Sequence, residues 1–173
     1  MAPDVVKEAK VELVAYDVNW PSLFEAERKV LMQSLAGWLV GEIEHIGSTA
    51  VVGLCAKPVI DIMAPVRSLA ESIAAIPVVE RAGYVYYPYK PALMHWFCKP
   101  SPGHRTHHLH LVPLDSELWG QRLTFRDALR GSAALRAEYV SLKRELASKF
   151  GHDREAYTEG KSTFVARVLA SGT

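Results

Sequence analysis

The chain has 173 residues, of which 49% are hydrophobic and 23% are charged, and its formal net charge is +1. This composition fits one globular domain with a buried core, and it excludes a disordered or collagen-like chain. So small a net charge gives no global field that would attract nucleic acid or an anionic membrane, so any recognition of phosphate has to be local.

Strands and helices alternate in the first half of the chain. The expected elements are a strand at 10–15, a helix at 21–35, strands at 38–46 and 58–63, and a helix at 69–81. The first helix begins near Pro21 and carries an apolar stripe at helical spacing. The strand at 38–46 alternates apolar and polar residues and ends at Gly47-Ser48. Pro77 interrupts the second helix.

Three more strands and then a purely helical region complete the pattern. Aromatic and β-branched residues predict strands at 84–87, 94–99 and 106–112, and helical periodicity predicts helices at 118–129, 135–146 and 153–170. We expect an α/β (α+β) fold within a single domain that spans 1–173. A mixed β-sheet with packed helices would occupy about 10–113, and a helical C-terminal subdomain would occupy about 115–170.

The cysteines and the N-terminus indicate a cytoplasmic protein without a membrane partner. Cys55 and Cys98 form neither a C-x-x-C pair nor the even set of a secreted scaffold, so we expect buried free thiols. Residues 1–8 lack the apolar core of a signal peptide. No stretch approaches the ~18 apolar residues of a membrane span.

Gly47-Ser48 and Asp61 form the first candidate site. A Gly-Ser turn after a strand can present backbone N–H groups to a phosphate, and a carboxylate on a neighbouring strand can hold the Mg²⁺ that this phosphate carries. Lys57, in the loop between them, could receive phosphate. Two-metal phosphoryl transfer usually needs two or three clustered carboxylates, however, and Met63 stands two residues after Asp61. The alternative is a structural Asp61 bonded to a backbone turn or to Lys57.

A histidine cluster marks the last predicted strand. His104, His107, His108 and His110 lie within seven positions. In a strand, His108 and His110 point to one face, and with Asp61 they would form a two-histidine, one-carboxylate set suited to Zn²⁺, Mn²⁺ or Fe²⁺. One alternative is a packed histidine with solvated or hydrogen-bonded neighbours, and another is a general base, since imidazole titrates near neutrality.

Further basic and aromatic residues lie near these positions. Arg105 precedes the histidine strand and Lys99 ends the strand before it, so both could receive phosphate or remain solvated surface charges. Tyr157 and Lys161 are spaced i, i+4 and would face one side of a helix. The pair Trp96-Phe97 could stack a base or pack in the core.

A series of short motifs extends from about Leu13 to Leu169. They are Tyr16-Asp17, Trp20-Pro21 and Phe24; the stretches 43–49, 53–54 and 57–62; then 105–110 and 125–130; and Glu138-Tyr139, Leu142-Lys143, Tyr157 and Lys161-Ser162. With these motifs the chain resembles GrpB family proteins, which are placed in the nucleotidyltransferase superfamily. The resemblance implies a nucleotidyltransferase-like mixed β-sheet with added helices, while the family's biochemical activity is poorly defined.

The resemblance also assigns roles by position. The superfamily's phosphate turn falls on Gly47 and Ser48, and its first metal-binding carboxylate falls on Asp61. Its second acid would fall on Met63, which cannot bind Mg²⁺, and its third near His108 or His110. Because Mg²⁺ prefers oxygen ligands, histidines at this site would favour a softer metal.

Three functions are compatible with these residues. The first is a nucleotidyltransferase-type enzyme that moves a nucleotidyl or phosphoryl group to a small acceptor. In this enzyme Asp61, His108 and His110 would hold a divalent metal (Mg²⁺, Mn²⁺ or Zn²⁺). The residues that would hold the phosphates are Gly47, Ser48, Lys57, Arg105 and Lys161. The second is a non-catalytic protein that binds a nucleotide or small phosphorylated metabolite, which Met63 favours. The third is a metal-dependent hydrolase that uses the histidines and Asp61.

Overall fold

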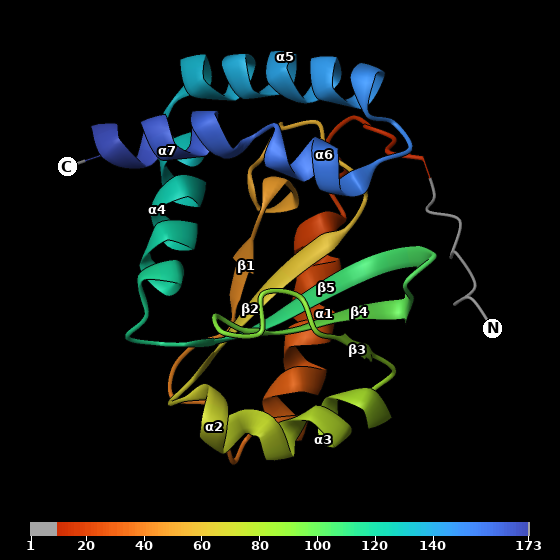
Figure 1. The fold of residues 1–173 in the computed structure, drawn as a ribbon, viewed down its shortest axis with the longest axis vertical. Helices are drawn as coiled ribbons and strands as arrows, with labels where there is room; N and C mark the ends of the chain where they lie inside the picture. Colours follow the sequence, from red (N-terminus) through yellow and green to blue (C-terminus); the bar gives the residue numbers. More distant parts are fainter. Residues whose placement is uncertain (1–9, 173) are drawn as a thin grey trace.

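The centre of the computed structural model, which describes residues 10–172, is a five-stranded sheet (Figure 1). The strand order is β1-β2-β5-β4-β3, and the strands are β1 (Glu44–Ile46), β2 (Ile60–Val66), β3 (Val85–Tyr87), β4 (His95–Ser101) and β5 (His104–Pro113). Strands β2 and β5 are parallel, and the other neighbouring pairs are antiparallel. The expected mixed sheet is therefore confirmed.

Helices cover both faces of this sheet. They are α1 (Trp20–Ser34), α2 (Leu69–Ser72), α3 (Ile76–Arg81), α4 (Glu117–Gly131), α5 (Ala133–Lys149), α6 (Arg154–Glu159) and α7 (Ser162–Ser171), with 3₁₀ turns η1 (Ser48–Ala50) and η2 (Ile73–Ala75). The helices α1, α2 and α3 lie on one side of the sheet, and α4 to α7 lie on the other side in the view of Figure 1. The expected C-terminal helices are confirmed.

Side-chain alternation in β2 divides the core into two parts. Ile60 and Ile62 pack toward α1 with Leu109 of β5, whereas Met63 packs on the opposite face with residues of β4 and α4. Asp61 shares the Met63 face because successive strand residues point to opposite sides. This alternation directs the Asp61 carboxylate toward the C-terminal helices.

One predicted strand is absent from the structure, and another is shorter than expected. The segment 10–15 forms no strand, and its only sheet-like contact is an isolated bridge between Val14 and Ala56. Of the segment 38–46, only β1 is a strand. Pro65 of β2 accepts a hydrogen bond through its carbonyl but has no N–H to donate, and this interrupts regular pairing beyond β1.

Two predicted helices are divided. The segment 69–81 consists of α2, η2 and α3, and Pro77 lies in the first turn of α3, where its missing N–H is not needed. The segment 153–170 forms α6 and α7, which meet at Gly160-Lys161. A Cβ atom on Gly160 would clash with the Leu146 side chain, so α6 ends in close contact with α5. The break leaves Lys161 at the junction between two helices.

Other expectations concern the cysteines, the membrane and the N-terminus. Cys98 is buried and Cys55 is half-buried, and both are free thiols. None of the helices within residues 10–172 combines the length and apolar character that a membrane-spanning helix requires. Residues 1–8, where the sequence predicts no signal peptide, lie outside the described part of the chain.

Candidate functional site

Gly47-Ser48 and Asp61 lie side by side in the structure. The register of β1 and β2 pairs Ile46 with Asp61, so the chain reaches Gly47 directly beside the carboxylate. Gly47 has a φ angle of 73°, and a Cβ atom there would lie only 2.6 Å from Asp61 Oδ2. Glycine is required at this position both by the left-handed backbone and by the close approach of Asp61.

Strand β5 brings two histidines to the same carboxylate. The parallel register pairs Asp61 with His108 and Met63 with His110. His108 Nδ1 lies 3.0 Å from Asp61 Oδ1, and His110 Nε2 lies 3.6 Å from the same oxygen. His107 faces the other way, and its Nδ1 atom is 2.8 Å from Thr106 Oγ1. The three side chains that the sequence predicts to converge therefore meet at one oxygen.

Burial and neighbouring rings determine the charges of this group. Burial alone would raise the pKa of Asp61, but the interactions with His108 and His110 outweigh it and hold this pKa well below its usual value. Burial lowers the pKa of His110 to about 4, so this ring is neutral at pH 7. Because an ionised carboxylate only accepts hydrogen bonds, His108 donates its Nδ1 proton to Asp61.

The arrangement of Asp61, His108 and His110 gives a specific reason against the predicted metal site. Within residues 10–172, no group of three or more His, Cys, Asp or Glu side chains is arranged to hold a metal ion. The Nε2 atoms of His108 and His110 are buried and have no hydrogen-bond partner. Met63, which would replace the second acid, is fully buried in the core. A metal bound by Asp61 and both histidines would have to replace the proton that His108 Nδ1 donates to Asp61 Oδ1.

Two basic residues that the sequence analysis missed complete the site. Lys143 of α5 is buried, and its Nζ atom donates to Ser48 Oγ at 3.0 Å and to the carbonyl of Cys55. Arg122 of α4 has a pKa that burial lowers and that the nearby Asp61 raises. A sequence signal for Lys143 existed, because it follows the buried Tyr139 by one helical turn and so falls on the apolar stripe of α5.

The amino groups of Lys57 and Lys161 both lie over the ring of Tyr157 in α6. Their Nζ atoms lie 5.0 Å and 4.6 Å from the ring centroid. Burial, together with the positive charges of Lys57 and Lys143, lowers the pKa of Lys161 to about 7, although Asp61 opposes this shift. Burial likewise lowers the pKa of Lys143 to about 8. We call Lys57, Arg122, Lys143 and Lys161 the basic cluster.

Arg105 and Lys99 do not join the basic cluster. Arg105 donates from Nε to the carbonyl of Pro102 at 2.9 Å, and its guanidinium lies 5.2 Å from the centroid of the Trp96 ring. Lys99 lies on the opposite face of the sheet, where Nζ is 2.7 Å from Oε1 of the buried Glu27. Of the basic residues predicted to receive phosphate, Lys57 and Lys161 are the two that lie in this cluster.

A groove of about 790 Å³ opens beside β1, away from this cluster. Phe24 and His45 line it from the α1 side of the sheet, and Arg126 and Arg130 line it from α4. Arg126 Nη1 lies 2.6 Å from Glu44 Oε2 and 3.1 Å from the carbonyl of His45. Arg126 is thus engaged in closing the exposed edge of β1.

The sequence model of the GrpB protein family matches residues 10–171. The chain belongs to the GrpB family. A UPF0157 protein of Pseudomonas aeruginosa is 39% identical over 164 residues, which are 92% of this chain and 66% of that relative. The glutamate-rich protein GrpB of Alkalihalophilus pseudofirmus is 34% identical, over 95% of this chain and 97% of its own length.

A solved structure of this family has the same fold. The crystal structure of the conserved protein GrpB from Enterococcus faecalis superimposes on this chain with a TM-score of 0.82 at 30% sequence identity. The superposition covers 93% of this chain and 96% of the Enterococcus faecalis chain. A longer relative is named dephospho-CoA kinase, from Mycolicibacterium paratuberculosis. It is 30% identical over 186 residues, and this GrpB chain spans only 44% of its length.

Proposed function

We propose that this GrpB protein binds a nucleotide or another small phosphorylated metabolite at the basic cluster. The observation that carries the proposal is the number of cations gathered beside one carboxylate. Asp61 raises the pKa of Arg122 and of Lys161, whereas the charge of Lys57 lowers the pKa of both Lys143 and Lys161. Like charges held together in a half-buried place are unfavourable without an anion, so a phosphate group would relieve their repulsion.

The Gly47-Ser48 turn supports the same ligand. A left-handed glycine followed by a 3₁₀ turn can turn backbone N–H groups toward phosphate oxygens. Lys143 would hold this turn in place through its hydrogen bond to Ser48 Oγ. Lys57, Arg122 and Lys161 would add positive charge near the phosphate oxygens.

The name of one relative favours a nucleotide among phosphorylated ligands. The protein named dephospho-CoA kinase contains a segment similar to this chain. Its name refers to a reaction on dephospho-CoA, a molecule that contains a nucleotide. This supports placing nucleotides first in a ligand screen.

Transfer of a nucleotidyl or phosphoryl group is the second candidate. The observation that favours it is the position of Asp61 beside Gly47-Ser48 on adjacent antiparallel strands, since the nucleotidyltransferase superfamily pairs its phosphate turn with its first carboxylate in this way. Asp61, His108 and His110 are the residues that would hold a divalent cation (Mg²⁺, Mn²⁺ or Zn²⁺). The cation would supply charge neutralisation at the transferred phosphoryl group.

The test is a binding screen that separates phosphate recognition from metal dependence. Unfolding temperature and calorimetric affinity are measured with ATP, GTP, CTP, UTP and inorganic tripolyphosphate, each with and without Mg²⁺, Mn²⁺ or Zn²⁺. A ligand present at 100 times its Kd stabilises the folded protein by about 2.7 kcal/mol. We expect stabilisation without metal from the basic cluster alone, and a further metal-dependent increase if the transferase or hydrolase function applies.

Variants assign the effect to the site. Lys161→Met should weaken binding at least about tenfold, because it removes a charge from the phosphate contacts. Lys149→Met is the control, since Lys149 is an exposed lysine paired with Glu145 at 3.3 Å. Asp61→Asn should abolish any metal-dependent part. If no ligand stabilises the wild-type protein, or if both lysine variants behave alike, the proposed phosphate site is wrong.

A further inference from the structure

Two exposed tyrosines lie at the end of β3 and in the connection that follows it. Tyr87 is 51% exposed and Tyr89 is 36% exposed. Both rings contact Trp96, with centroid distances of 6.0 Å and 6.1 Å. Trp96 in turn lies 4.9 Å from the ring of His108, which is bonded to Asp61. A continuous series of rings therefore extends from the Asp61 site to the protein surface.

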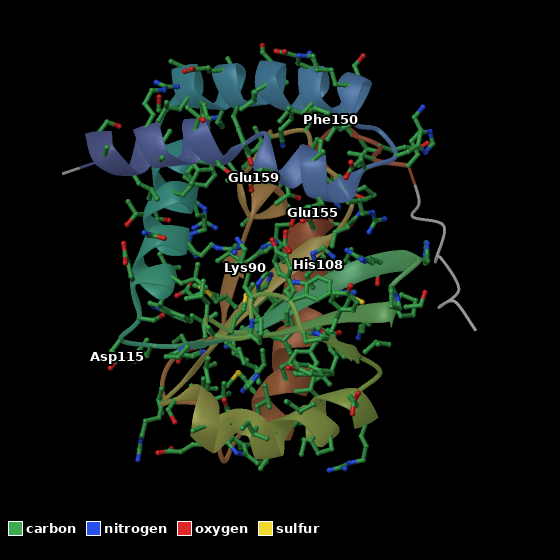
Figure 2. The ribbon with its side chains drawn as sticks, viewed as in Figure 1. Lys90, His108, Asp115, Phe150, Glu155 and Glu159 are labelled. Atoms are coloured by element: carbon green, nitrogen blue, oxygen red, sulfur yellow. The ribbon has the colours of Figure 1, made fainter. Side chains whose placement is uncertain are left out.

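Tyr89 is also an electrostatic neighbour of the basic cluster. Tyr89 and Asp61 both raise the pKa of Arg122, against the burial that lowers it. The next residue, Lys90, has its Nζ atom 5.4 Å from the Tyr89 ring centroid. Figure 2 shows the labelled Lys90 and His108 below α6 in this view. Through the ring contacts with Trp96 and His108, Tyr89 is connected to the Asp61 site beside which the phosphates are proposed to bind.

Hydrogen bonds hold the connection in one shape. Lys90 has a positive φ angle of 47°, and its carbonyl accepts hydrogen bonds from the N–H groups of Leu93 and Met94 at 2.9 Å and 3.2 Å. Met94 Sδ lies 3.3 Å from His110 Nδ1, which fixes the end of the connection to the site. The tyrosine rings are therefore already positioned, and binding a ligand against them costs little ordering.

The exposed rings, rather than the tryptophan, are available to a ligand. Trp96 is only 6% exposed, because Arg105, His108 and the two tyrosines cover it. Trp96 supports the tyrosines from below and cannot itself stack on a base. An aromatic surface beside a phosphate site offers no contact to an inorganic polyphosphate, whereas it suits a planar base.

We infer that Tyr89, supported by Tyr87 and Trp96, stacks on the base of a nucleotide whose phosphates contact the basic cluster. This inference rests on the proposed phosphate-binding function and narrows its ligand class from phosphorylated metabolites to nucleotides. Stacking uses the π-face that every base has, so the tyrosines should select for the presence of a base more strongly than for its identity.

The test compares a ligand with a base and one without. Calorimetric Kd values are measured for ATP and for inorganic tripolyphosphate with the wild type, Tyr89→Ala, Tyr89→Phe and Leu93→Ala. Leu93 is the matched control, since it is 49% exposed in the same connection. Stacking predicts that Tyr89→Ala raises the Kd for ATP by about 5- to 150-fold. It also predicts an unchanged Kd for tripolyphosphate, and near wild-type Kd values for Tyr89→Phe and Leu93→Ala.

The possible failures are distinguishable. If the wild type binds tripolyphosphate as tightly as ATP, or if Tyr89→Ala weakens both ligands equally, the stacking role is wrong while the phosphate site stands. If the wild type binds neither ligand, the proposed function fails and the stacking role fails with it. If Tyr89→Ala does not fold, the wild-type Kd values for ATP and for tripolyphosphate alone decide whether the base adds affinity.

Discussion

Gly47 has a left-handed backbone and lies against the Asp61 carboxylate, whereas Gly53 has a φ angle of 80° with nothing near its Cα that a side chain would meet. The two glycines share a conformational requirement but differ in their surroundings. Their comparison separates the cost of backbone strain from the cost of displacing Asp61.

We expect Gly53→Ala to lower the free energy of unfolding by about 1–2 kcal/mol, because an L-residue is strained at positive φ. Gly47→Ala should lower it further and should also reduce affinity for tripolyphosphate at least about tenfold, since its methyl group would push Asp61 and the turn apart. Urea unfolding and calorimetry measure the two effects. Equal stability and equal affinity in both variants would contradict a tight contact at Gly47.

The lowered lysine pKa values predict opposite pH dependences for binding and for stability. Lys161 and Lys143 have pKa values of about 7 and about 8. As pH rises from 6.5 to 9, both lose their protons and affinity for tripolyphosphate should fall. In the ligand-free protein their contribution to the free energy of unfolding should rise over the same range, because lysines of the unfolded chain retain more protons.

Calorimetry at several pH values and urea unfolding without ligand measure these two trends. Lys161→Met should flatten the fall in affinity, and Lys149→Met should leave it unchanged. An affinity that stays constant between pH 6.5 and 9 would mean that Lys161 does not contact the anion and that the charge of Lys143 does not affect it.

At the residue scale, the sequence reveals those parts of the site that are close along the chain. Gly47-Ser48 and Asp61 are separated by one short loop, and strand alternation is enough to bring His108 and His110 together. Lys143 lies 95 residues from Ser48. Its position on the apolar stripe of α5 predicts burial, but only the packing of α5 over the Gly-Ser turn reveals its contact with Ser48.

At the scale of elements, sequence periodicity correctly predicts those helices and strands that the tertiary packing also stabilises. The long helices α1, α4 and α5 and the strands β3, β4 and β5 appear where the pattern places them. Each of these three helices buries one continuous face. The predicted boundaries of elements are wrong where a proline or a glycine interrupts regular structure, as at Pro65 and Gly160. The segment 10–15 has strand-like residues, but it makes only a bridge because no neighbouring strand is available along its length.

The contact of α1 with β4 provides a test at this scale. Glu27 Oε1 accepts hydrogen bonds from Tyr84 and Lys99, both at 2.7 Å, within a mostly apolar core. Glu27→Gln should lower the free energy of unfolding by about 2–4 kcal/mol, because it leaves the partly buried Lys99 without its counter-charge.

Urea unfolding measures this loss, with Glu25→Gln as the control. Glu25 is half-exposed and pairs with Arg28 at 3.1 Å on the surface of α1, so its loss should cost at most about 1 kcal/mol. The double variant Glu27→Gln, Lys99→Met should recover part of the stability. Equal losses for the two single glutamate variants would rule out a special role for the buried pair.

At the scale of the whole molecule, a cluster of aromatic rings joins the C-terminal helices to the site. Phe164 of α7 stacks on Tyr139 of α5 at 5.1 Å, and Phe125 of α4 meets both rings edge-on at 6.1 Å and 5.4 Å. Val51 and Leu54, which follow the Gly-Ser turn, pack in the same cluster. The position of Lys161, three residues before Phe164, depends on this packing.

Phe164→Ala should lower the free energy of unfolding by about 3 kcal/mol and should also weaken tripolyphosphate binding, since α7 would no longer hold Lys161 in place. Leu31→Ala is the matched control, because Leu31 is fully buried on the other face of the sheet and its loss should destabilise without changing Kd. Calorimetry well below the unfolding temperatures measures Kd. A similar Kd in both variants would show that the helices and the site are independent.

The hydrogen bond between Lys143 and Ser48 has a consequence for how the protein is made. A nascent chain that has emerged only as far as β5 contains the Gly-Ser turn, Asp61 and both histidines, but it lacks Arg122, Lys143 and Lys161. Its carboxylate would repel a phosphate rather than attract one. Affinity for the ligand therefore arises only after the last helices have docked, so a phosphorylated ligand in the cell would stabilise finished molecules and leave incomplete ones to chaperones and proteases.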